Sequence, residues 1–139
     1  MRILAIDYGR KRIGLAISDP LGMMAHSLET LHCRSLRKDL AYLQGIIRVQ
    51  DVHLLVVGNP IHLNGTASEM SVEAEAFAAR LSEHAGVPYR MWDERMTSQE
   101  AGHLLRETGR KAQRDGGVDR LAAQIILDSY LSAQSQDAQ

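Results

Sequence analysis

Short apolar runs alternate along the chain with longer segments in which apolar residues recur at helical spacing. The first pattern predicts strands and the second predicts helices. The first two runs are joined by Tyr8-Gly9-Arg10-Lys11, and a short joint that contains glycine predicts a β-hairpin. Residues 53–58 are almost wholly apolar, as in a strand with both faces covered. The predicted strands cover residues 2–7, 12–18, 26–31, 53–58 and 87–92, the third being the weakest.

Helices are predicted from capping residues next to apolar stripes. The predicted N-terminal caps are Ser35, Thr66 with Glu69, and Thr97 with Glu100, and the predicted stops are Gly86 and Gly109. A polar loop rich in Arg and Gly follows at 110–117, and the last helix covers about 118–131. The polar tail 132–139 is expected to be frayed.

The element order is three strands, helix, strand, helix, strand, helix, helix. A meander followed by βαβ-type crossovers predicts an α/β fold, a five-stranded mixed sheet flanked by α-helices. This is the order of a ribonuclease H-like fold. With 139 residues, 45% of them hydrophobic, the chain suits one domain over residues 1–139.

Charge and cysteine content narrow the setting of the protein. The net charge is −1, so bulk charge does not announce a nucleic-acid partner, although the basic residues are mostly arginines in clusters. Cys33 is the only cysteine, which fits a reducing compartment. The sequence contains neither a signal-peptide pattern nor an apolar run long enough to span a membrane. We therefore expect a cytoplasmic protein without a membrane partner.

Three acidic residues stand where predicted elements begin or end. Asp7 closes the first strand, Glu94 follows the fifth beside Asp93, and Asp119 opens the last helix. Carboxylates that converge from separate elements form a site for a hard divalent cation, Mg²⁺ or Mn²⁺. Such a site is a common means of phosphodiester cleavage. The six histidines lack the spacing of a zinc site.

Each acid also has a structural interpretation. Asp7 precedes Tyr-Gly and suits a turn. Asp93 and Glu94 suit the approach to a helix N-terminus, and strand alternation does not decide which of them binds metal, although we favour Glu94. Asp119 suits a first helical turn, but it shares a face with Ala123 and other apolar residues, where an inward carboxylate needs a partner or a cation.

Four blocks of the chain resemble those of the YqgF/RuvX family of nucleases. Residues 7–19, beginning Asp-Tyr-Gly, resemble its opening signature, and 57–60 with Asn64-Gly65 resemble its second block. Residues 93–98 and 119–127 are similar to the third and fourth. Asn59 departs from the apolar residue expected in the second block, so the local shape of that loop is expected to differ.

The resemblance implies a ribonuclease H-like fold related to RuvC resolvases, with Asp7, Glu94 and Asp119 as catalytic metal ligands. It also implies maturation of the 5′ end of the small-subunit ribosomal RNA precursor, with that RNA and the small ribosomal subunit as partners. The family has also been connected with Holliday junctions in branched DNA, and a role in transcription has been proposed for it.

These observations lead to a hypothesis of two-metal phosphodiester hydrolysis, in which Asp7 bridges the ions. The basic residues expected to position the nucleic-acid backbone are Lys11, Arg12, Arg95, Arg110, Lys111 and Arg114. Arg95 has an alternative role as an ion-pair partner of a neighbouring acid.

The alternatives are a junction resolvase, a non-catalytic RNA-binding assembly factor, and an ATP-using phosphotransferase, which needs a second domain. Because no exposed apolar stripe stands out, we expect a monomer or a weak homodimer.

Overall fold

A computed structural model describes residues 1–96 and 117–137, with the backbone alone described for residues 117–120 and 136–137. The strands are β1 (Arg2–Asp7), β2 (Arg12–Ser18), β3 (Ala25–Ser27), β4 (Leu31–His32), β5 (Val52–Asn59) and β6 (Tyr89–Asp93). The helices are α1 (Leu36–Val49), α2 (Glu69–Ala85) and α4 (Gly117–Asp137), and Glu94–Met96 form a 3₁₀ turn. None of these helices is long and apolar enough to cross a membrane.

The strands form one mixed sheet in the order β3-β2-β1-β5-β6, and β4 pairs with β2 outside this path. β1, β5 and β6 are parallel, whereas β2 runs antiparallel to both β1 and β3. The predicted α/β fold and the hairpin at Tyr8–Lys11 are therefore confirmed. The predicted strand over 26–31 is two strands, because β3 and β4 pair with opposite ends of β2 and residues 28–30 leave the ladder.

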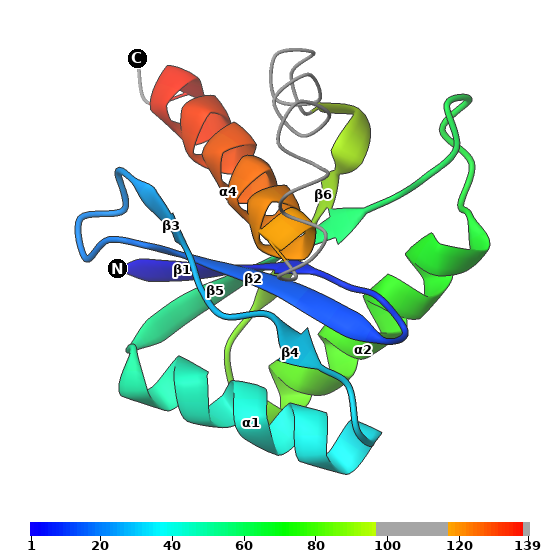
Figure 1. Cartoon of the computed structure of the whole chain (residues 1–139). Coiled ribbons are helices and arrows are strands. Elements are labelled where there is room, and N and C mark those ends of the chain that lie inside the picture. The colour runs from blue at the N-terminus through cyan, green and yellow to red at the C-terminus, as the bar shows by residue number, and fades with distance from the viewer. Residues whose placement is uncertain (97–116, 138–139) are drawn as a thin grey trace.

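Two apolar layers cover the sheet, one on each face. Figure 1 shows α1 and α2 together below the sheet and α4 above it. Alternation along each strand divides the core accordingly. In β1, Leu4 and Ile6 belong to the layer under α1 and α2, while Ala5 belongs to the layer under α4. The small Ala5, Ala16 and Ala123 let α4 lie close to the sheet.

The helix ends follow local chemistry. Ser35 caps α1 as predicted, accepting a hydrogen bond from the Lys38 N–H at 3.2 Å. The predicted Thr66–Glu69 capping box is wrong, because α2 starts with a box formed by Ser68 and Ser71. The Thr66 hydroxyl instead donates to Asn64 Oδ1 at 2.7 Å within the preceding loop.

The C-terminal ends of the helices differ in how well they were predicted. Gly86 ends α2 in the left-handed region with a φ of 73°, as predicted. The expectation of a frayed tail is wrong for residues 132–137, which continue α4. That segment contains neither glycine nor proline, so no residue in it stops the helix. The helix predicted from Thr97 lies outside the described residues.

Candidate active site

The carboxyl ends of three parallel strands meet at one edge of the sheet. Ile6 of β1 pairs with Val57 of β5, and Gly58 of β5 pairs with Trp92 of β6. One further step along β1 brings Asp7 beside Gly58. Glu94 begins the 3₁₀ turn directly after β6. Asp7 and Glu94, which are far apart in the chain, therefore flank the same strand.

Strand alternation gives the face on which each of these residues lies. Ala5 and Val56 belong to the apolar layer under α4, so Asp7 and Gly58, two residues further on, lie on that face too. Trp92 also faces α4: its ring meets Tyr130 edge-on at 5.3 Å, and its Nε1 donates to Ser129 Oγ at 3.0 Å.

The Glu94 carboxylate lies directly over Gly58. A Cβ built on Gly58 would be 2.6 Å from Glu94 Oε1 and 2.6 Å from Ile126 Cδ1 of α4. A glycine at this position leaves the room that the carboxylate occupies between the sheet and the helix. Glu94 is thus on the same face of the sheet as Asp7, and the sequence signal for this placement was a glycine at the end of a buried strand.

Asp93 and Glu94 have different environments. The sequence spacing alone did not decide which of them is the metal ligand. The side chain of Asp93 forms a bidentate pair with Arg95, with Nη2 2.8 Å from Oδ2 and Nε 3.1 Å from Oδ1. These hydrogen bonds lower the pKa of the Asp93 carboxyl. The pKa of the Glu94 carboxyl is raised, first by burial and then by the negative charge of Asp93. A nearby cation would offset that cost, so Glu94 suits a metal ligand better than Asp93.

The third predicted ligand lies at the start of α4. Asp119 belongs to the first turn of that helix, four residues before the buried Ala123, and the structure describes only its backbone. Figure 1 shows this end of α4 over the central strands, and α4 contacts β1, β2 and β5. Among the side chains that are described, no group of three or more His, Cys, Asp or Glu forms a metal cluster. Asp7 and Glu94 are the two predicted ligands whose side chains the structure describes, and the metal-binding role of all three acids stays a prediction.

The basic residues predicted to bind nucleic acid fall into three sets. Lys11 and Arg12 are exposed on the hairpin that follows Asp7. Arg95 is an ion-pair partner of Asp93 and also donates from Nη1 to the Leu63 carbonyl at 3.0 Å. Most of the Arg95 donors are therefore used within the protein. Arg110, Lys111 and Arg114 lie outside the described residues.

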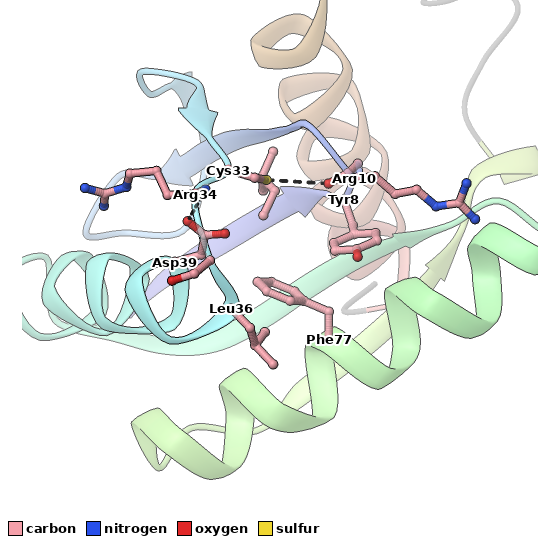
Figure 2. A pocket seen from close by; sticks show the side chains of 10 residues that line it. Tyr8, Arg10, Cys33, Arg34, Leu36, Asp39 and Phe77 are labelled. Carbon is pink, nitrogen blue, oxygen red and sulfur yellow. Dashed lines mark hydrogen bonds between the residues drawn. The ribbon is translucent and has the colours of Figure 1, made fainter.

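Contacts with α2 hold the hairpin of residues 8–11, and the sequence analysis did not predict them. Arg10 forms a bidentate pair with Glu73 of α2, with Nη2 2.6 Å from Oε2. Tyr8 packs on Phe77 of α2, with 5.1 Å between ring centroids. Figure 2 shows both rings in a pocket of about 260 Å³ on the α1 and α2 side of the sheet. These contacts hold the backbone immediately after Asp7.

The same pocket contains a buried carboxylate that the sequence pattern did not single out. Asp39 is 5% exposed, and its Oδ1 accepts a hydrogen bond from the Arg34 backbone N–H at 3.2 Å (Figure 2). Beside it, the Cys33 thiol lies 3.7 Å from the Gly9 carbonyl, and burial raises its pKa. A raised pKa disfavours the thiolate, so these groups support the hairpin rather than supply a nucleophile.

The arrangement as a whole corresponds to a known class of nuclease fold. The solved structure of Thermus thermophilus RuvC in complex with a Holliday junction substrate matches with a TM-score of 0.64, over 97% of each chain and at 15% identity. The fold is therefore the ribonuclease H-like fold of RuvC-type resolvases, as the element order predicted. It positions two carboxylates on one face at the carboxyl edge of its parallel strands.

Sequence comparisons give the family. A family model described as RuvX, Holliday junction resolvase, matches residues 1–133. A Koribacter versatilis protein named "putative pre-16S rRNA nuclease" is 44% identical over 137 residues, covering 98% of this chain and 90% of that protein. A Syntrophus aciditrophicus protein of the same name is 44% identical over 138 residues, covering 99% of this chain and 92% of that protein. The chain belongs to the RuvX family, and the resemblance stated from its motifs is confirmed.

Proposed function

We propose that this protein is a divalent-metal-dependent nuclease that trims the 5′ side of the small-subunit ribosomal RNA precursor. The observation that carries the proposal is the Glu94 carboxylate, held over Gly58 on the face of the sheet that Asp7 shares. The name shared by the two relatives supports the choice of RNA substrate. Such a precursor is made in the cytoplasm, where we expect the protein to act.

The proposed ligands are Asp7, Glu94 and Asp119. Two divalent cations, Mg²⁺ or Mn²⁺, bound there would supply activation of water and stabilisation of the leaving oxygen. Of these residues, Asp7 and Glu94 supply half-buried oxygen donors. Ile126 and the alanines under α4 exclude water on the inner side of that set. Because hard cations bind ionised carboxylates, Glu94 must lose its proton before the site is competent.

The exposed hairpin next to Asp7 gives the proposed site a way to hold the backbone of the substrate. Lys11 and Arg12 are exposed to solvent at the start of β2, the strand that pairs with the strand of Asp7. Arg110, Lys111 and Arg114 are further proposed phosphate contacts. Contacts of this kind orient a strand and carry little sequence information.

A second candidate function is cleavage of branched DNA, favoured by the description of the family model and by the fold of RuvC. A resolvase cuts two strands symmetrically and so acts as a two-fold dimer, whereas a precursor-trimming enzyme can act as a monomer or a weak homodimer. A protein that stays monomeric in solution would therefore argue against the resolvase.

The test is a cleavage assay with Mg²⁺ and with Mn²⁺ on an rRNA precursor that carries its 5′ leader and on a four-way DNA junction. Asp7→Asn should abolish cleavage and weaken Mn²⁺ binding measured by calorimetry. Asp51→Asn, an exposed acid near the other end of β5, is the matched control and should leave both unchanged.

Cutting of the RNA alone supports the processing nuclease, and symmetric cutting of the junction supports the resolvase. RNA binding without any cleavage would favour a non-catalytic assembly factor. Unchanged Mn²⁺ affinity in Asp7→Asn would rule out Asp7 as a ligand.

A further inference from the structure

The loop of residues 60–68 leaves β5 at the edge of the sheet where Asp7 and Glu94 lie (Figure 1), and it contains an exposed leucine. Leu63 is 92% exposed. A single exposed apolar side chain is ordinary on a protein surface. The backbone that carries this one is held by a set of hydrogen bonds.

The loop is fixed by its own hydrogen bonds. The His62 N–H donates to the Thr66 carbonyl and the Gly65 N–H donates to the His62 carbonyl, both at 2.9 Å. Asn64 Oδ1 accepts from both the N–H of Thr66, at 3.0 Å, and its hydroxyl, at 2.7 Å. These bonds form a closed turn around Leu63 and hold the backbone from which its side chain projects.

A second set of contacts ties this turn to the candidate active site. Arg95 Nη1 donates to the Leu63 carbonyl at 3.0 Å, and the bidentate pair with Asp93 holds the guanidinium in place. Gly65 lies beside that guanidinium, which is 3.8 Å from its ideal Cβ position, and its φ of 88° is in the left-handed region that favours glycine. Arg95 directly follows Glu94. The position of the leucine is therefore linked to that of a proposed metal ligand.

Chain geometry limits how far the leucine lies from the site. Leu63 is four residues beyond Asn59, the end of β5, so it lies at most about 14 Å from that strand end. A nucleic-acid strand advances about 3.4 Å per step in a duplex, so Leu63 reaches a nucleotide within roughly four steps of the cleavage position. Its aliphatic side chain gains nothing from a phosphate. It can pack on the face of a base that has left its stack, as apolar wedge residues do.

We propose that Leu63 packs against an unpaired base of the substrate strand beside the cleavage site, which makes the 60–68 loop a single-strand selector. This inference rests on the proposed nuclease function. It assigns Arg95 a positioning role through the loop, in place of the direct phosphate contact expected from the sequence.

The test measures binding rather than cleavage, using the full chain in the Asp7→Asn background. The probe is a short single-stranded RNA with 2-aminopurine placed at each position in turn, compared with the same RNA annealed to its complement. Leu63→Ala should weaken single-strand binding about five-fold, because less apolar area is buried against the base, and should abolish the fluorescence change at one position. Duplex binding should stay unchanged.

Two variants serve as controls. Leu63→Met keeps an apolar side chain of similar reach and should restore single-strand binding. Val49→Ala removes another apolar side chain, 80% exposed at the end of α1, and should have no effect. Because Leu63 and Val49 are both exposed, all three variants should fold, which thermal melting checks.

The outcomes separate this inference from the proposal beneath it. Equal single-strand binding by the starting protein and Leu63→Ala overturns the inference alone. A change of oligomeric state in Leu63→Ala with unchanged RNA binding also overturns it, because the leucine then belongs to a contact between copies. Failure to bind either RNA before Leu63 is changed overturns the proposed RNA substrate and the inference together.

Discussion

Replacing Gly58 by alanine tests the geometry of the site most directly. The new Cβ would lie 2.6 Å from both Glu94 Oε1 and Ile126 Cδ1, whereas real Cβ contacts stay beyond 3.0 Å. Both atoms are the ends of flexible side chains, so both can retreat and the protein should still fold. Overpacking of this kind costs about 1–3 kcal/mol of unfolding free energy.

The effect on the site should be larger than the effect on the fold. A misplacement on the order of 1 Å costs about 10²-fold in rate when reacting groups must be aligned. Gly58→Ala should therefore lower cleavage about a hundredfold and weaken Mn²⁺ binding while the protein still melts cooperatively. The measurements are initial rates at saturating Mn²⁺, calorimetric Mn²⁺ titration and thermal melting on the same preparation.

Gly45 provides the matched control. It lies within α1, and no atom lies within 4 Å of a Cβ built there. Gly45→Ala should raise stability by about 0.5–1 kcal/mol, because alanine is the better helix former, and should leave cleavage unchanged. Full activity and full Mn²⁺ affinity in Gly58→Ala would refute the placement of Glu94 as a ligand over this glycine.

Two further predictions follow from the pKa of Glu94 and from the cap of α2. Burial raises the pKa of Glu94 in the folded protein above its value in the unfolded chain, about 4.3. As the pH rises through these two pKa values, Glu94 becomes ionised in a buried position and the metal-free fold loses stability. Glu94→Gln should therefore raise the Tm of the metal-free protein at about pH 7 but not at about pH 3, and Mn²⁺ should stabilise it less than the unchanged protein. Glu75 is exposed, so the same Tm shift in Glu75→Gln would contradict an effect of Glu94 burial. Ser68→Ala should lower the unfolding free energy by about 1 kcal/mol, and by more than Thr66→Ala, in urea titrations; equal losses would contradict the cap.

The sequence was most informative where local pattern and long-range packing agree. The bounds of the first two strands were predicted correctly, because an apolar run, a glycine-containing turn and a second run leave few alternatives. The 26–31 segment was harder, because β3 and β4 are short edge strands whose pairing depends on β2 and not on their own residues. Thr66 and Ser68 are both good caps, and the path of the loop decides between them.

The candidate site also has parts that the sequence predicts and parts that depend on the fold. Asp7 and Glu94 were identifiable as acids at strand ends, but the position of the Glu94 carboxylate over Gly58 depends on the pairing of β6 with β5. The contact of Arg95 with the Leu63 carbonyl crosses from one loop to another. No periodicity along the chain reports such a contact, so the bracing of the 60–68 loop was not predictable.

The late position of α4 in the chain has a consequence for when the proposed site is completed. α4 covers the apolar layer of Ala5, Ala16 and Val56, and its Ile126 closes on Gly58 beside Glu94. During synthesis β1, β5 and β6 leave the ribosome first, and the face that carries Asp7 stays uncovered until α4 follows. The face that carries Asp7 and Glu94 is therefore completed only after all the strands of the sheet have been made. The order of synthesis thereby makes α4 the last described element to join the proposed site.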